Sequence, residues 1–196
     1  RPVPLARGFH TPSSFAAWAK IGPEYLDTIG DTTHRDFDGW GNLHYANDTG
    51  RNDIVAAKAA CDKTNIYFYV QTHANLTPYT DANWMQLLID ADQNAQTGWN
   101  GYDYVVNSRV VDAETTTLKR LSDGKTWPVK YHASGNQMQI VVPRALLGLT
   151  NTAGTQFDFH WADNVPVGTG DIADWWYNGD SAPDGRFNYR YENIAP

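Results

Sequence analysis

Oxygen-bearing side chains alternate directly after the most apolar stretch of the chain. Asp90, Asp92 and Asn94 follow the segment Met85-Gln86-Leu87-Leu88-Ile89. Carboxylate and amide oxygens at alternate positions of a turn are the ligands with which calcium-binding loops begin. The alternative interpretation is an Asx-rich hairpin turn, in which these side chains bind the backbone of their own loop.

The spacing departs from that of an EF-hand. Ala95 stands at the sixth position, where the sharp turn needs glycine, and Gly101 stands at the twelfth, where a glutamate is required. Calcium also accepts looser cages of oxygen ligands. Asp103, at the start of the next predicted strand, could add a carboxylate, and Gln96 could add a backbone carbonyl.

Tryptophans provide a second kind of chemistry. The chain is 13% aromatic and has eight tryptophans, more than a core of this size usually needs. A sugar ring has an apolar face of C–H groups that stacks on an aromatic ring. Trp175 and Trp176 are neighbours, so in an extended strand only one could face the core and the other would point outward. The alternative is a core rich in tryptophan.

Sugar hydroxyls would need polar side chains around such rings. Candidates near the central hairpin or the late loop are Asp81, Asn83, Gln86, Asn107 and Asn178. Arg51 could also bind sugar, but pairing with a neighbouring acid is the preferred interpretation for it. The late loop is rich in oxygen ligands for a second cation or for sugar hydroxyls, although a solvated role is preferred for any single one: Asp163, Asn164, Asp171, Asp174, Asp180 and Asp184.

Composition narrows the function classes. The net charge of −7 and the lack of a basic run argue against binding to nucleic acid. No apolar run approaches the roughly 20 residues that a membrane-spanning helix needs. The single cysteine, Cys61, cannot form an internal disulfide and is expected to be buried.

Enzyme motifs are missing from the sequence. It contains no nucleophile elbow, phosphate-binding loop or dinucleotide fingerprint, and its six histidines lack zinc-type spacing. A glycosidase needs two carboxyl groups about 5 to 10 Å apart, and an aspartate pair of that kind stays an alternative. A purely structural accessory domain is a further alternative.

The positioning elements are predicted to be strands. Short β-type segments separated by turn residues predict an all-β, antiparallel β-sandwich in a single domain over residues 1–196, with residues 1–30 as a linker-derived or wrapping segment. Residues 31–53 are predicted to be a long loop with one edge strand near 43–45. The composition of the alanine-rich segment 54–61 is ambiguous between helix and strand, but the turn and the strand that follow it favour a hairpin. The predicted strands are 54–61, 66–72, 85–89, 102–106, 115–121, 127–133, 137–143, 156–162 and 186–191, with single helical turns at 15–18 and 143–148.

The order of these motifs resembles family 9 carbohydrate-binding modules. The likeness spans roughly residues 50–196 and rests on the strand 66–70, Trp84, the apolar strand that ends at Asp90, the acidic turn, and the aromatic strand that ends at Asn107. It implies a jelly-roll-like sandwich that is not catalytic. It also implies a secreted, extracellular module that binds an oligo- or polysaccharide beside a neighbouring catalytic domain, usually a glycoside hydrolase.

In that family two tryptophans clamp a terminal sugar, and bound calcium stabilises the sandwich. The resemblance places Trp84 at the first clamp position and draws the second from Trp175 or Trp176. Related sandwich domains bind haem through methionine and histidine. Here both methionines, Met85 and Met138, lie in strands that are predicted to be core.

Overall fold

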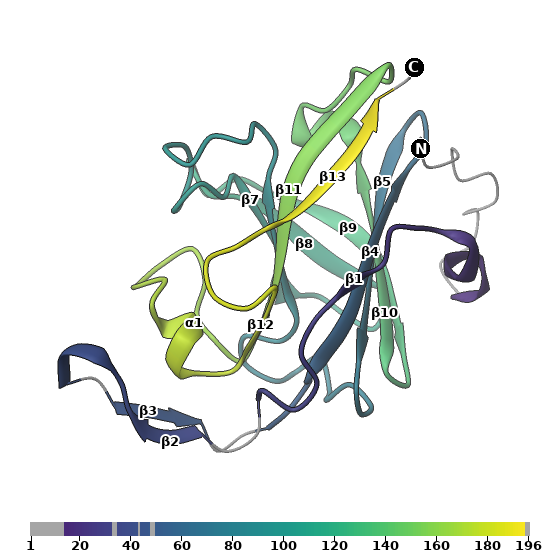
Figure 1. The fold of residues 1–196 in the computed structure, drawn as a ribbon. Coiled ribbons are helices and arrows are strands. Elements are labelled where there is room, and N and C mark those ends of the chain that lie inside the picture. The colour runs from purple at the N-terminus through teal and green to yellow at the C-terminus, as the bar shows by residue number, and fades with distance from the viewer. Residues whose placement is uncertain (1–13, 33–34, 43, 48–49, 195–196) are drawn as a thin grey trace.

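The structure, a computed structural model, describes residues 14–32, 35–42, 44–47 and 50–194 (Figure 1). Antiparallel strands dominate it and its helices are short, which confirms the all-β prediction. The strands are β1 (Tyr25–Leu26), β2 (Arg35–Asp38), β3 (His44–Asn47), β4 (Ile54–Cys61), β5 (Asn65–Thr72), β6 (Gln86–Asp90), β7 (Tyr104–Val110), β8 (Thr115–Arg120), β9 (Thr126–Ser134), β10 (Gln137–Pro143), β11 (Gly154–Asp163), β12 (Asp180–Ala182) and β13 (Tyr189–Ile194). The helices are the 3-10 helices Ala16–Lys20, Trp40–Asn42 and Arg144–Leu147 and the α-helix α1 (Asp174–Tyr177).

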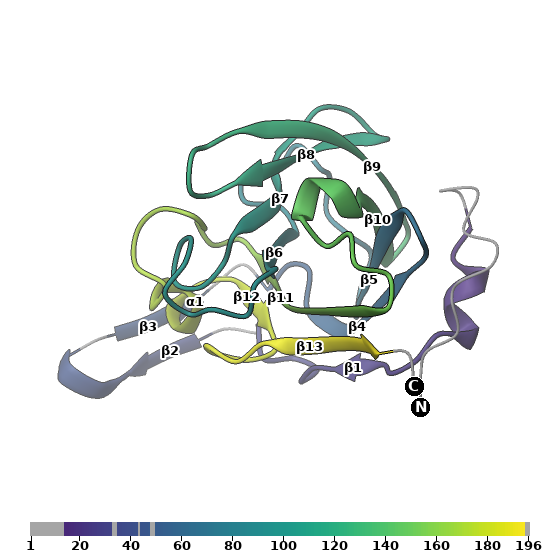
Figure 2. The same ribbon diagram turned by 90° about the horizontal axis from the view of Figure 1, so that it is seen from above.

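Eleven strands form one continuous sheet in the order β1-β4-β5-β10-β9-β8-β7-β6-β11-β12, and β13 also pairs with β11. β11 is long enough to pair with β6 on one edge and with β13 and then β12 on the other. Figure 2 shows the sheet curling round, so that β13 lies beside β1. The finer description as a two-sheet, jelly-roll-like sandwich stays a prediction. Within the described residues, no helix combines the length and the apolar character needed to cross a membrane.

The curl brings β5 and β11 together across an apolar core. The ring of Phe68 lies 5.5 Å from that of Phe157 and 5.7 Å from that of Phe159, centroid to centroid. Tyr67 and Tyr69, the alternate residues of β5, face the other way and pack with Trp18 of the first 3-10 helix. β5 is therefore covered on both faces, as a nearly continuous run of β-branched and aromatic residues predicts.

The same double covering explains the alanine-rich segment 54–61, which is strand β4. Ala57 and Ala59 belong to the main core, whereas Ala60 packs under Trp18 on the outer face. The indole N–H of Trp18 donates to Gln139 Oε1 at 2.8 Å. The described part of the predicted wrapping segment thus lies on β4 and β5, and residues 1–13 lie outside the described residues.

Two parts of the chain differ from the predictions. The loop expected at 31–53 contains two strands, because β2 and β3 pair with each other as a separate hairpin (Figure 1). The extended strand assumed around Trp175 and Trp176 is wrong, because these residues lie in α1. Local bonds set this turn: Asp171 Oδ1 accepts from the Ala173 N–H at 2.9 Å, and the Asn178 N–H donates to the Asp174 carbonyl at 2.9 Å.

A neutral histidine is buried where α1 meets β11. His160 is fully buried, and its Nδ1–H donates to the Phe187 carbonyl oxygen at 2.8 Å. Its ring stacks on Trp175 with centroids 4.3 Å apart. Burial lowers the pKa of His160 to about 3, because a charged imidazole would lie in an apolar environment.

This burial predicts a specific pH dependence of stability. The unfolded chain protonates His160 near pH 6.5 and the folded chain does so only near pH 3, so its contribution is complete above pH 6.5 and is lost as the pH falls. Between these limits the wild type should lose up to about 1.4 kcal/mol per pH unit relative to His160→Gln. Urea unfolding of both proteins between pH 4 and 7.5 measures this difference. Parallel stability curves for the two proteins would contradict it.

Candidate functional site

An open, polar depression lies between the loop that precedes β6 and the end of β7. Its volume is about 510 Å³. Tyr79 and Trp84 border both this depression and a smaller hollow of about 190 Å³ next to Tyr131. The depression is lined by Tyr79, Thr80, Asp81, Ala82, Asn83, Trp84, Asn107, Ser108, Arg109, Val110 and Val111. Four of the predicted sugar-binding residues, Asp81, Asn83, Trp84 and Asn107, therefore border one surface.

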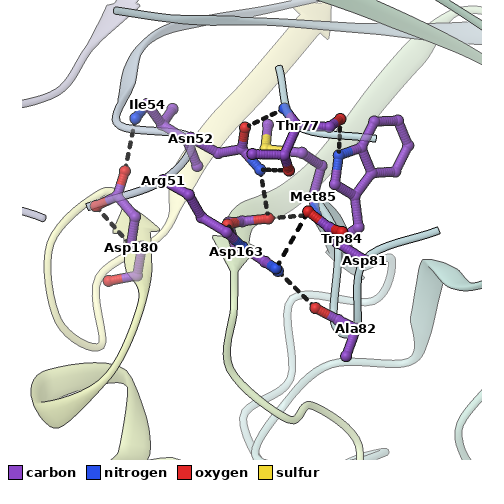
Figure 3. Close-up of polar contacts among 11 residues, drawn as sticks. Arg51, Asn52, Ile54, Thr77, Asp81, Ala82, Trp84, Met85, Asp163 and Asp180 are labelled. Carbon is purple, nitrogen blue, oxygen red and sulfur yellow. Dashed lines mark hydrogen bonds and ion pairs between the residues drawn. The ribbon is translucent and has the colours of Figure 1, made fainter. Parts of the chain in front are cut away.

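The loop under this depression is held by a buried carboxylate (Figure 3). Asp163, at the end of β11, accepts from Arg51 Nε at 2.9 Å, from Asn52 Nδ2 at 3.0 Å and from the Met85 N–H at 2.8 Å. Burial raises the pKa of Asp163, while the Met85 N–H and the guanidinium of Arg51 lower it and offset part of that effect. The preferred interpretation of Arg51, pairing with an acid, is confirmed.

The same network fixes the loop at both ends. Asn52 Oδ1 accepts from the Thr77 N–H at 2.9 Å, and Asn52 Nδ2 donates to Thr77 Oγ1 at 2.9 Å. Arg51 Nη2 donates to the Ala82 carbonyl oxygen at 2.5 Å, and Arg51 Nη1 lies 3.6 Å from Asp81 Oδ2 (Figure 3). The loop therefore presents Tyr79 and its neighbours from a fixed backbone.

Two of the predicted clamp tryptophans, Trp84 and Trp175, do not offer open faces. Trp84 is 3% exposed, and its indole N–H donates to the Thr77 carbonyl oxygen at 2.9 Å. Trp175 is 2% exposed and packs among His160, Tyr102 and Trp99. Stacking on sugar requires an open ring, so the clamp role predicted for these two residues does not fit their burial. The side chain of Trp176 lies outside the described part of the chain.

Two other predicted ligand-binding residues are buried. Gln86 is buried in β6. Asn107 is also buried, and its Nδ2 donates to the Met85 carbonyl oxygen at 2.7 Å while its Oδ1 accepts from Thr116 Oγ1 at 2.7 Å. Asn107 thus joins β7 to the start of β6 beneath the depression. Asn178 follows α1 and is not part of the lining.

The two methionines, which related domains would use as haem ligands, are both core residues. Met85 and Met138 have no exposed surface, which confirms their predicted place in the core. Cys61 is buried as well and accepts a hydrogen bond from the hydroxyl of Tyr191 at 3.2 Å.

The predicted calcium ligands converge between β6 and β7. Asp90, Asp92 and Asp103 each offer a carboxylate oxygen, and these oxygens lie within 4.8 Å of one another. Asp90 ends β6, and Asp103 precedes β7, whose pairing with β6 sets the separation of the two residues. Burial raises the pKa of Asp90 to about 6, and the charges of Asp103 and Asp92 add to this effect. All three donors are carboxylate oxygens, which suit a hard cation.

The loop between these carboxylates also has the features of an Asx turn. The Asn94 N–H donates to Asp92 Oδ1 at 2.9 Å, and Asn94 Oδ1 accepts from the Gln96 N–H at 3.1 Å. Asn94 and Gln96, which were predicted as ligands, are exposed and take part in the turn. The side-chain oxygens of Asp92 and Asn94 fix the loop by accepting from backbone N–H groups, and the three carboxylates are the residues that the structure brings together.

Some residues of interest were not found from the sequence. Tyr79 was missed because one aromatic residue in a polar loop gives no sign of its exposure, which is 37% here. Asp27, Asp31 and Asp53 join the predicted late-loop residues Asp180 and Asp184 in two further acidic groups. These residues come from three segments far apart in the chain, so no local spacing could reveal them.

No protein-family model, curated protein or solved structure matches the chain. The fold defines an antiparallel all-β protein, and its function must be inferred from the geometry described above.

The Asp163 network leads to a stability prediction. Arg51→Met would leave the buried carboxylate without its cationic partner, so unfolding free energy should fall by about 3 kcal/mol. The matched control is Arg120→Met, which breaks the exposed pair with Asp123 and should cost far less, because solvent screens that pair. Chemical denaturation of both variants measures the difference. Equal losses would show that the Arg51–Asp163 contact is not the anchor described here.

Proposed function

We propose that the chain is a non-catalytic carbohydrate-binding module that acts outside the cell beside a polysaccharide-active enzyme. The main support is the polar depression, which combines a partly exposed aromatic ring with a rim of carboxylate, amide and guanidinium groups. The resemblance of residues 50–196 to family 9 modules agrees with this proposal. In it, Tyr79 replaces the buried Trp84 and Trp175 as the stacking residue.

The chemistry of the lining suits a saccharide. Tyr79 can pack against the C–H face of a sugar ring, and its neighbours Asp81 and Asn83 can bind hydroxyl groups. Arg109 borders the same depression and adds further hydrogen-bond donors. Because the Asp163 network already fixes the loop, binding should require little ordering of the backbone.

Calcium is the proposed structural cofactor. Asp90, Asp92 and Asp103 would hold it, with water or backbone carbonyls completing the six to eight oxygen ligands that calcium takes. The ion would neutralise carboxylates that repel one another and would brace the turn between β6 and β7. Its role is to stabilise, since these residues do not line the depression.

The sugar site is tested by removing the exposed ring. Tyr79→Ala should weaken binding to the best polysaccharide about tenfold, if the stacking contact is worth roughly 1.4 kcal/mol. Affinity electrophoresis against a panel of soluble polysaccharides, followed by calorimetry on the one that retards the protein most, measures the effect. Phe187→Ala is the control, because this ring is 77% exposed but lies outside the lining.

Two results would contradict the sugar proposal. One is no retardation on any polysaccharide, which would favour a structural accessory domain. The other is equal loss of binding in both variants. Turnover of a glycoside substrate that an Asp→Asn change abolishes while binding is retained would favour the enzyme alternative.

Calcium binding is tested by thermal unfolding in EDTA and in calcium. At a calcium concentration about a hundredfold above its Kd, the melting temperature of the wild type should rise by roughly 5 to 10 °C. In Asp103→Asn, calcium should raise the melting temperature by less than in the wild type, because the site at the β6–β7 turn is lost. The control Asp112→Asn changes an exposed aspartate in another Asx turn and should keep the full rise. An undiminished rise in Asp103→Asn would remove the β6–β7 turn as a calcium site.

A further inference from the structure

Five aspartates from three distant segments meet at one place. Asp31, Asp53 and Asp180 each offer an oxygen within 4.8 Å of the others, and Asp27, Asp31 and Asp184 form a second such group. The two groups share Asp31, so they make one acidic cluster, here called the seam cluster. It is separate from the group formed by Asp90, Asp92 and Asp103.

The seam cluster lies where the two ends of the curled sheet meet. Asp180 begins β12, the last strand of the order, and Ile54 begins β4, the second. The Ile54 N–H donates to Asp180 Oδ2 at 2.6 Å, so the carboxylate joins these two strands (Figure 3). Thr28, close to Asp27 in the chain, donates from its Oγ1 to Asp184 Oδ2 at 3.4 Å.

Other side chains cross the same seam beside the cluster. The hydroxyl of Tyr25 in β1 donates to the Arg190 carbonyl oxygen in β13 at 2.6 Å. The hydroxyl of Tyr189 donates to the Leu26 carbonyl oxygen at 3.2 Å. Side-chain hydrogen bonds therefore join β1 and β13, which do not pair with each other in the described sheet.

The most buried carboxylates of the cluster are held in fixed positions. Asp180 is 1% exposed, and its Oδ1 accepts from the Ser181 N–H at 3.0 Å in addition to the bond from Ile54. Asp53 is 8% exposed, and its Oδ2 accepts from the Gly30 N–H at 2.9 Å. Backbone donors from both sides of the seam therefore orient these groups before any ion binds.

One oxygen in the cluster gives an independent sign of a ligand. Asp53 Oδ1 is buried and has no hydrogen-bond partner among the residues that the structure describes. The nearby base His73 approaches the other oxygen, with Nδ1 3.5 Å from Asp53 Oδ2, and its side chain is 65% exposed. A buried carboxylate oxygen without a donor is costly, and a cation would satisfy it.

Electrostatics agrees with this geometry. Burial raises the pKa of Asp27 to about 7, and the charges of Asp184 and Asp31 raise it further. Burial and the charge of Asp31 also raise the pKa of Asp180 well above its usual range. The carboxylates of the cluster repel one another when ionised, and a divalent cation would remove that repulsion.

We propose that Asp31, Asp53 and Asp180 bind a calcium-sized divalent cation that closes the seam between the first and last strands of the sheet. The donors are all carboxylate oxygens, which suits calcium better than zinc, whose structural sites are built mainly from cysteine and histidine. Asp27 and Asp184 flank the ion and add negative charge. Water or backbone carbonyls complete its coordination.

The number of bound ions tests this proposal separately from the calcium site at the β6–β7 turn. Each protein is dialysed against calcium, and bound metal is measured by elemental mass spectrometry. Asp53→Asn should bind one calcium fewer than the wild type while keeping the ion at the turn. Asp103→Asn should lose the ion at the turn and keep the one at the seam. Equal calcium content in Asp53→Asn and the wild type overturns the seam site, as does complete loss of calcium in Asp103→Asn.

Hydrogen exchange of the wild type gives a test that needs no variant to fold. Adding calcium to the metal-free protein should slow amide exchange at least tenfold in peptides covering residues 24–32 and 178–184, which the ion would join. Protection of residues 88–104 alone would mean that calcium binds at the turn and not at the seam. Protection of neither region would count against both sites, and protection of the seam alone would retain this proposal and reject the other.

Discussion

Two buried carboxylates, Asp163 and Asp180, hold residues 51–54 at the start of β4, and the positions of both candidate sites depend on this contact. Asp163 and Asp180 lie opposite each other on β11 and β12. Asp163 binds Arg51 and Asn52, and Asp180 binds the N–H of Ile54, so both anchor the start of β4. Hydrogen bonds to charged groups are stronger than neutral ones, and a buried carboxylate is stable only when its oxygens are partnered. This requirement fixes where the last strands must lie relative to β4.

Both candidate sites follow from this anchor. On one side, Asn52 donates a hydrogen bond to Thr77 and Arg51 donates one to Ala82. These bonds fix the loop under the depression. On the other side, Asp53 lies between these residues and Ile54 and turns its carboxylate toward Gly30 across the seam. A surface that binds sugar benefits from such a rigid loop, because less conformational entropy is lost on binding.

The sequence predicts features that depend on neighbours in the chain. The apolar run before Asp90 predicts a buried strand, and β6 is buried at every position. Asp90, Asp92 and Asp103 meet because a short hairpin joins them. The burial of Trp84 and Trp175 could not be predicted in this way, since a loop tryptophan has the same local sequence whether or not Thr77 or His160 covers it. The seam cluster escaped for a related reason: its carboxylates come together only when the sheet curls and its ends meet.

The curl also gives the proposed cation a physical role in the fold. Among the described strands β1 and β13 lie side by side without pairing, so cross-links would hold them together, and the only cysteine is buried in the core against Tyr191. Tyrosine hydroxyls provide part of the closure between β1 and β13. Carboxylates gathered at the same seam repel one another when ionised, so by themselves they would open it. With a bound cation the carboxylates would stabilise the seam instead of opening it. Each would be attracted to the same ion, and the ion would cross-link the segments that carry them.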